Sequence, residues 1–162
     1  MVAEIEQKGV KAAALPLNVG DVAVSTVLLR KVREVLQQRW QRETFDYLLN
    51  NAGIGLNIPF AETSEAQFDE LMNIQFKGPF FLTQRLLPLL QDGGRILNVS
   101  SGLARFALPG YAAYASMKGA DGGADALPGE GAGRNAEFRS ILLRPARLKP
   151  ILAAVWSGIT RR

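Results

Sequence analysis

The 162-residue chain contains no cysteine and no histidine. The lack of cysteine excludes a disulfide framework and a thiol nucleophile, and the lack of both residues excludes a Cys/His metal site. Without histidine, every catalytic triad that needs an imidazole base is excluded as well. Any chemistry in this chain must therefore use serine, tyrosine, lysine, aspartate or glutamate, and we expect no bound metal.

Long hydrophobic runs are also missing. The longest uninterrupted apolar stretch, Ile151 to Trp156, is far shorter than the roughly 20 residues that cross a bilayer. The N-terminal sequence MVAE lacks the basic and apolar regions of a signal peptide. With 48% hydrophobic residues, the chain has enough apolar side chains for one domain with an ordinary core. We therefore expect a cytoplasmic protein that does not bind membranes.

The charge of the chain is concentrated at its C-terminal end. Residues 1–133 carry 12 basic and 14 acidic side chains, a net charge of −2, whereas residues 134–162 carry 7 basic side chains and one acidic side chain, a net charge of +6. A basic tail can bind nucleic acid, but this tail lacks interleaved aromatic residues and any helix or zinc-finger pattern. We interpret it as a solvated or poorly ordered end and do not expect nucleic acid as a partner.

Strand-like and helix-like segments alternate along the first part of the chain. Lys11 to Leu17 and Phe45 to Leu49 are short apolar runs that predict buried strands, and Arg95 to Val99 predicts a third strand after the turn Asp92-Gly93-Gly94. Apolar residues recur at helical spacing from Val24 to Trp40 and from about Ser64 to Leu90, where Gly78 and Pro79 predict a kink. This alternation favours an α/β fold with a parallel sheet and crossover helices.

The pattern is weaker after Lys118. Six glycines lie between residues 119 and 133, together with Pro128, so we expect only a short helix that ends before this proline. Phe138 to Leu143 is compatible with a fourth strand, and Ile151 to Ile159 with either a short strand or a short helix.

Tyr114 and Lys118 are separated by four positions, which places them on one face of a helix. A nearby positive charge favours the phenolate and lowers the pKa of a tyrosine from about 10 toward the working pH. A tyrosine with a lowered pKa can exchange a proton with a substrate oxygen. The pair alone is also compatible with chance.

Two further polar sequences follow predicted strands. Ser101 ends the strand Arg95 to Val99, where its hydroxyl could bond the same substrate oxygen, because ligands of parallel sheets bind beyond the carboxyl ends of the strands. A serine that caps the next segment is an equally good interpretation. Asn50-Asn51-Ala52-Gly53 follows the strand Phe45 to Leu49, and its small residues would either let backbone approach a ligand or simply form a tight turn.

In combination, these three features resemble the short-chain dehydrogenase/reductase family over about residues 10–120. The resemblance implies a Rossmann-like domain in which Tyr114 is the general acid/base, Lys118 binds the nicotinamide ribose and lowers the tyrosine pKa, and Ser101 orients the carbonyl or alcohol. It also implies that Asn51, Ala52 and Gly53 line the cofactor, NAD or NADP, together with Asn18, which stands where the family usually has an aspartate. The implied reaction is hydride transfer between the nicotinamide cofactor and a carbonyl or secondary alcohol.

The family resemblance extends to an apolar substrate site. It implies that Leu103, Phe106, Leu108 and the loop Leu56 to Phe60 line this site. A ketone, aldehyde or secondary alcohol of modest polarity would suit such a lining.

The sequence also departs from the family. No glycine-rich phosphate loop precedes Asn50, Gln75 stands where the family has an asparagine, and the first two strands of the family sheet are missing. We therefore expect one partial Rossmann-like domain over residues 1–162, truncated at its N-terminus, with a divergent and poorly ordered segment over residues 119–162. The missing strands would leave the edge of Phe45 to Leu49 open to another strand or to a second copy of the chain. The alternative to an enzyme is a non-catalytic remnant or an interaction module.

Overall fold

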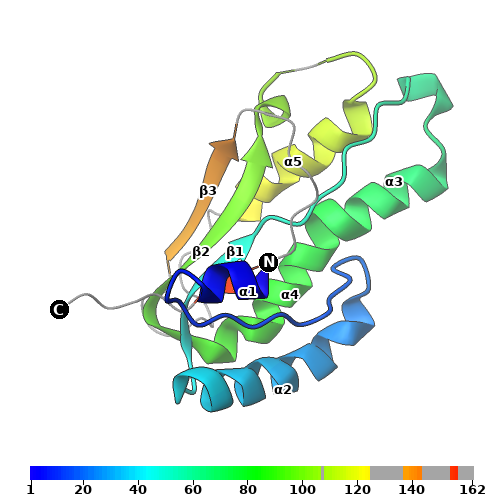
Figure 1. The fold of residues 1–162 in the computed structure, drawn as a ribbon. Coiled ribbons are helices and arrows are strands. Elements are labelled where there is room, and N and C mark those ends of the chain that lie inside the picture. Colours follow the sequence, from blue (N-terminus) through cyan, green and yellow to red (C-terminus); the bar gives the residue numbers. More distant parts are fainter. Residues whose placement is uncertain (107, 125–136, 144–153, 157–162) are drawn as a thin grey trace.

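The computed structural model describes residues 1–106, 108–124, 137–143 and 154–156 of the chain (Figure 1). Four strands form one sheet in the order β3-β2-β1-β4. β1 (Phe45–Asn50), β2 (Leu90–Ser101) and β3 (Glu137–Leu143) are parallel, whereas β4 (Ala154–Trp156) pairs antiparallel with β1. The predicted parallel sheet and its strands at residues 45–49, 95–99 and 138–143 are therefore confirmed.

Helices precede β1 and occupy the segments from β1 to β2 and from β2 to β3. α1 (Val2–Glu6) is followed by the 3-10 turn η1 (Val22–Val24), by α2 (Ser25–Val35) and by the π-helical turn η2 (Leu36–Trp40). Between β1 and β2 lie η3 (Phe60–Glu62), α3 (Glu65–Met72), the π-helical turn η4 (Asn73–Lys77), α4 (Gly78–Leu86) and η5 (Leu87–Leu89). The 3-10 turn η6 (Gly102–Ala104) and α5 (Ala112–Ala124) follow β2. None of the helices described is long and apolar enough to span a membrane.

The long helical segment between β1 and β2 changes its hydrogen-bond pattern where the sequence predicts a kink. The π-helical turn η4 ends at Lys77, directly before Gly78 and Pro79. A proline cannot donate a hydrogen bond to the carbonyl one turn earlier, so the regular ladder cannot continue through this position. α3 and α4 are therefore joined by the π-helical turn η4 in one continuous helical segment over residues 65–86.

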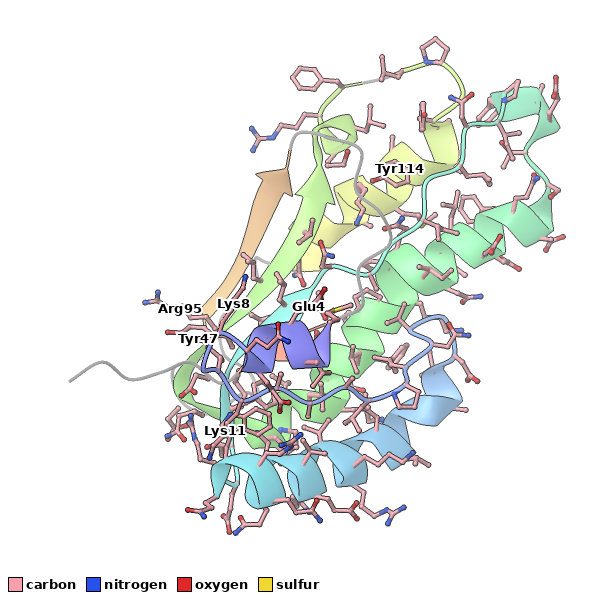
Figure 2. All side chains as sticks on the ribbon, in the orientation of Figure 1. Glu4, Lys8, Lys11, Tyr47, Arg95 and Tyr114 are labelled. Atoms are coloured by element: carbon pink, nitrogen blue, oxygen red, sulfur yellow. The ribbon has the colours of Figure 1, made fainter. Side chains whose placement is uncertain are left out.

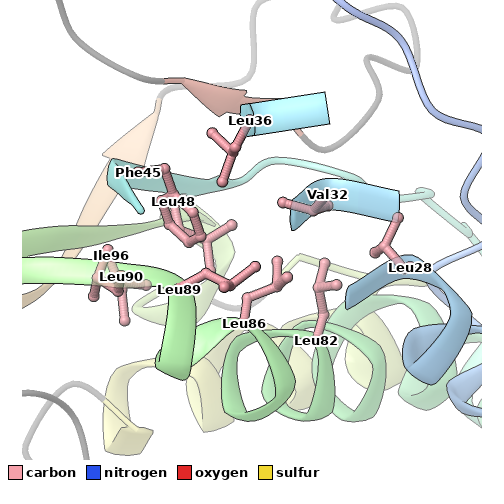
Figure 3. Close-up of a cluster of buried hydrophobic side chains, with 10 residues drawn as sticks. All are labelled: Leu28, Val32, Leu36, Phe45, Leu48, Leu82, Leu86, Leu89, Leu90 and Ile96. Atoms are coloured by element: carbon pink, nitrogen blue, oxygen red, sulfur yellow. The ribbon is translucent and has the colours of Figure 1, made fainter. Parts of the chain in front are cut away.

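The hydrophobic core lies between the sheet and helices α2 and α4 (Figure 3). Leu28, Val32 and Leu36 recur at four-residue spacing, which places them on one face of the α2–η2 helix. This face meets side chains from β1, α4 and the start of β2. The buried cluster consists of Leu28, Val32, Leu36, Phe45, Leu48, Leu82, Leu86, Leu89, Leu90 and Ile96.

The prediction of a strand at Lys11 to Leu17 is wrong. These residues form no strand in the described part of the chain, where the two positions beside β1 are taken by β2 and β4. Leu15 and Leu17 are instead partly buried against the hydrophobic core. The apolar residues that suggested a strand therefore serve packing without sheet hydrogen bonds.

The prediction that the edge of β1 lies open is also wrong at the positions that β4 covers. Trp156, Val155 and Ala154 pair with Tyr47, Leu48 and Leu49. β4 falls within the segment Ile151 to Ile159, for which the sequence allowed either a strand or a helix. The other residues of that segment lie outside the described part of the chain.

Asp92, Gly93 and Gly94 lie within β2 and not before it. The pairing advances from Phe45 to Tyr47 on β1 but from Leu90 to Arg95 on β2, so the extra residues form an irregularity in the strand. Gly93 has a φ of +77°, a conformation that favours glycine. The strand is therefore longer than predicted, and the predicted turn is its bulge.

The remaining predictions concern the two ends of the chain. Near the N-terminus, α1 is followed by a turn that ends at Gly9, whose φ of +77° favours glycine. The short helix expected after Lys118 is the end of α5, which continues to Ala124. Residues 125–136, the predicted end of this helix before Pro128, and most of the basic tail lie outside the described residues.

Candidate active site

The carboxyl end of β2 and helix α5 bring two of the predicted site residues together. Lys118 on α5 is only 7% exposed, and its Nζ donates a hydrogen bond to the carbonyl of Val99 at 3.0 Å. The hydroxyl of Ser100 donates to the backbone carbonyl of Lys118 at 3.4 Å. α5 is thus held at the end of the strand that terminates in Ser101, and the ammonium group of Lys118 has a fixed place there.

The hydroxyl of Ser101 performs the capping role that the sequence allowed. Its Oγ accepts a hydrogen bond from the backbone N–H of Leu103 at 3.2 Å, and Ser101 is the N-cap of η6. A serine hydroxyl has one donor and two acceptor sites, so this bond occupies one acceptor. Capping and orientation of a substrate oxygen are therefore compatible in the same side chain.

Tyr114 lies on α5, one turn before Lys118. Figure 2 shows it toward the carboxyl ends of β2 and β3, away from Tyr47 and Arg95. Its ring packs against that of Tyr111 in an edge-to-face arrangement, with 6.2 Å between the ring centroids. Helix α5 therefore carries Tyr114 and Lys118 on adjacent turns, as their spacing predicts.

The loop after β1 packs against the π-helical turn η4. A side chain at Gly53 would begin 3.0 Å from Oε1 and 3.2 Å from Nε2 of Gln75, which is tighter than ordinary contact. The amide nitrogen of Gln75 also donates a hydrogen bond to the carbonyl of Ile54. Asn51 and Ala52 precede this contact and are partly buried. Gln75 is 2% exposed and contacts the loop at Gly53 and Ile54.

Asn18 lies on a different segment, before α2, and is exposed. Its Oδ1 accepts a hydrogen bond from the N–H of Gly20 at 3.1 Å. A side chain at Gly20 would begin 3.1 Å from Ile74, so this segment and the loop at Gly53 both border η4. Gly20, two residues after Asn18, and Gly53, which follows Asn51 and Ala52, thus border the same helical turn, although Asn18 does not follow a strand.

A buried polar network beneath the site was not predicted. The side-chain nitrogen of Asn50 donates to Thr83 Oγ1 at 2.9 Å and to Asn98 Oδ1 at 2.8 Å. Asn50 and Asn98 are opposite each other in the β1–β2 register. Polar side chains at the ends of two apolar strands are the signal that could have indicated it. The network ties β1, β2 and α4 together where the candidate site begins.

The described residues fit one end of a dinucleotide better than the other. The buried, anchored ammonium of Lys118 and the close backbone approach at Gly53 suit a ribose and a nicotinamide ring. Before β1, the chain has only Gly9 and Gly20, which do not form a glycine-rich turn at a helix N-terminus. The arrangement is therefore compatible with a ligand at the nicotinamide end, and no glycine-rich phosphate loop precedes β1 in the sequence.

Solved structures show that the fold is Rossmann-like. Angucycline C-6 ketoreductase LanV with bound NADP superimposes with a TM-score of 0.80 and 33% identity, over 87% of this chain and 55% of that chain. The promiscuous reductase LugOII, which catalyses a keto-reduction in lugdunomycin biosynthesis, gives a TM-score of 0.81 and 32% identity, over 88% of this chain and 58% of that chain.

Sequence comparison then assigns the family. The model described as short chain dehydrogenase matches residues 1–134, and the chain belongs to this family. It is 31% identical over 135 residues to the 3-oxoacyl-[acyl-carrier-protein] reductase FabG of Thermotoga maritima, covering 81% of this chain and 55% of that protein. The short-chain dehydrogenase/reductase GME11373 of Pestalotiopsis microspora is 33% identical over 121 residues, 74% of this chain and 43% of that protein. The chain thus spans about half the length of these relatives.

Proposed function

We propose that the chain is part of an NAD(P)-dependent oxidoreductase that interconverts a carbonyl compound and a secondary alcohol, with its described segments acting as one domain. The observation that carries this proposal is the anchored position of Lys118 at the end of β2, beside Ser101 and one turn after Tyr114. Serine, tyrosine and lysine are also the side chains that remain for such chemistry in a chain without histidine or cysteine. The family match supports the same reaction class.

In the proposed mechanism, Tyr114 exchanges a proton with the substrate oxygen. Ser101 donates its hydroxyl hydrogen to that oxygen while its lone pair continues to accept from Leu103. Lys118 is held by its hydrogen bond to the carbonyl of Val99 and would hold the ribose of the cofactor. A bound nicotinamide nucleotide would supply or accept the hydride. Asn51, Ala52, Gly53 and Asn18 are the proposed contacts along the rest of the cofactor.

The substrate is proposed to be a ketone, aldehyde or secondary alcohol of modest polarity. Phe106 is 69% exposed and Leu108 is 55% exposed, so apolar side chains are available on the segment between Ser101 and α5. Two of the similar proteins are named as ketoreductases or reductases of ketone groups, LanV and LugOII. We therefore place ketones first among the substrates to test.

The test is a titration of the purified chain with NADH and NADPH, followed by nicotinamide fluorescence, and then a screen of ketones for cofactor oxidation. Tyr114→Phe should retain cofactor binding and lose at least about 100-fold in turnover, because general acid catalysis contributes roughly 10²–10⁴-fold. Lys118→Ala should weaken cofactor binding. Tyr111→Phe is the matched comparison, since it removes the same oxygen atom one turn earlier on the same stretch of chain. An equal loss of turnover in Tyr111→Phe would contradict the assignment of Tyr114.

A second candidate function is a non-catalytic remnant or an interaction module. The observation that favours it is the lack of a glycine-rich loop before Asn50. β4 covers the edge of β1, so a partner strand would have to add at β3 or β4, the two edges of the described sheet. Failure to bind either cofactor at millimolar concentration, in a sample shown to be folded, would favour this candidate over the enzyme.

A further inference from the structure

Two loops that are far apart in the sequence are joined beside the candidate site. The backbone N–H of Ile58 donates to the carbonyl of Gly110 at 2.8 Å, and Nδ2 of Asn57 donates to the carbonyl of Pro109 at 3.3 Å. The first loop follows β1, and the second leads into α5. We call Asn57, Ile58, Pro109 and Gly110 the loop clasp. It connects the cofactor side of the candidate site with the start of the helix that carries Tyr114.

Gly110 is required in the clasp for two separate reasons. Its φ is +82°, which L side chains rarely adopt. In addition, a Cβ at this position would lie 2.6 Å from Nδ2 of Asn57 and 2.9 Å from its Cγ and Oδ1. The side chain of Asn57 therefore occupies the space that any other residue at position 110 would need.

The clasp is continuous with the first turn of α5. The N–H of Tyr111, the next residue after Gly110, donates to the carbonyl of Leu108 at 3.2 Å. The carbonyl of Tyr111 accepts from the N–H of Ala115 at 2.8 Å, and the Tyr111 ring packs on that of Tyr114. The position of Gly110 thus constrains Tyr111, whose carbonyl accepts a hydrogen bond of the first turn of α5, one turn before Tyr114.

The other end of the same loop is also fixed. The carbonyl of Ile54 accepts a hydrogen bond from Gln75, whose side chain is almost completely buried. The loop is therefore held at Ile54 by the helix η4 and at Ile58 by the start of α5. Because the loop is hydrogen-bonded at both ends, a shift at one attachment should displace the other.

We propose that Asn57 is a positioning residue that sets the start of α5, and hence the place of Tyr114, through Gly110. This inference rests on the proposed function for its catalytic consequence but not for its structural one. Asn57 is exposed and does not belong to the hydrophobic core. We therefore expect its replacement to displace the start of α5 more than to destabilise the core. Loss of one net hydrogen bond, worth about 1 kcal/mol, corresponds to roughly a fivefold change in a local opening constant.

The first experiment is amide hydrogen exchange on the whole chain without ligand. Asn57→Ala should speed exchange about fivefold at Ile58, Tyr111 and Ala115 and leave Leu48 and Ile96 in the central strands unchanged. Asn57→Asp should behave like Asn57→Ala, because a carboxylate has nearly the same shape but cannot donate to Pro109. Three results would overturn the proposal. In Asn57→Ala, these are unchanged exchange at Tyr111 and Ala115, or a uniform increase that includes the strands. In Asn57→Asp, it is exchange at the wild-type rate.

The second experiment tests the steric side of the clasp and its catalytic consequence. Gly110→Ala should increase the same exchange rates, and it should do so less in the Asn57→Ala background, because the clashing side chain is then gone. Additive effects would contradict the contact. In an active sample, Asn57→Ala should lower kcat, by at most the roughly fivefold change in the opening constant, and change the Kd for NADPH less than twofold. If the wild-type chain shows no turnover, the proposed function fails while the exchange data still decide on the clasp.

Discussion

Two glycines that lie in helices should respond in opposite ways to replacement by alanine. Gly78 begins α4 with a φ of −60°, and Gly119 lies within α5. In an ordinary helix, alanine is more stable than glycine by roughly 1 kcal/mol, because it restricts the unfolded chain. Local sequence therefore predicts that both substitutions stabilise the protein.

The surroundings of Gly78 reverse this expectation. A Cβ there would lie 2.1 Å from the carbonyl oxygen of Val19, 2.9 Å from its carbonyl carbon and 2.7 Å from the oxygen of Asn73. All three are backbone atoms, which cannot rotate away as a side chain can. Overpacking costs about 1–3 kcal/mol, and the short distances place this case at the upper end. After subtraction of the helix gain of about 1 kcal/mol, we expect Gly78→Ala to lower the free energy of unfolding by about 2 kcal/mol.

Gly119→Ala is the matched control, because within the described residues, apart from its own helix backbone and chain neighbours, no atom lies within 4 Å of the position of its Cβ. It should raise the free energy of unfolding by about 0.5–1 kcal/mol. Urea denaturation followed by circular dichroism measures both values under the same conditions. If Gly78→Ala is neutral, or stabilises as much as Gly119→Ala, then the segment around Val19 does not pack on the helix as described, and the reasoning is refuted.

Three further predictions concern the stability of other elements. Leu28→Ala should lower the free energy of unfolding by about 2–5 kcal/mol, because Leu28 is only 5% exposed. Its neighbour Val27 is 49% exposed, so Val27→Ala should change the free energy of unfolding by less than about 0.5 kcal/mol in the same urea experiment. Ser64→Ala removes the capping box at the start of α3 and should cost about 1 kcal/mol, while Ser64→Asp should retain most of the cap. Arg42→Ala should cost about 0.5–1 kcal/mol, less at high salt, since it removes hydrogen bonds of 2.6 and 2.8 Å to Asp46. The hydrogen bond to Asp46 raises the pKa of Arg42, so as the pH rises this contribution is kept up to the ordinary arginine range and lost above it. The cost measured in urea should therefore be the same at pH 7 and pH 9.

The elements that could be predicted from the sequence are those with a strong local pattern. Leu28, Val32 and Leu36 follow the helical period, and Phe45 to Leu49 is a short, mostly apolar segment between polar residues. Their structure depends on side chains that are close in the sequence. The polar residues that follow β1 and β2 could be located for the same reason, because a strand and the turn after it form one local unit.

The features that could not be predicted depend on contacts between distant parts of the chain. The extended segment Lys11 to Leu17 looks like a strand locally, but a strand also needs a ladder partner, and β1 pairs with β4 from the far end of the chain. The role of Asn57 depends on Pro109 and Gly110, and that of Gln75 on Gly53 and Ile54. The hydrophobic period of one segment does not reveal which distant segment it contacts.

The same distinction separates the two ends of the candidate site. Ser101, Tyr114 and Lys118 lie within one strand–helix unit, and the bond from Lys118 to Val99 anchors the helix that carries Tyr114 to the strand that ends in Ser101. Asn18, by contrast, is held through Val19 and Gly20 against the helix at Ile74 and Gly78. A displacement of that segment by Gly78→Ala should therefore weaken the binding of a nicotinamide dinucleotide through its Asn18 end, while hydrogen exchange at Tyr114 and Lys118 stays as in the wild type. Faster exchange on α5 in this variant would show that the two ends are not independent.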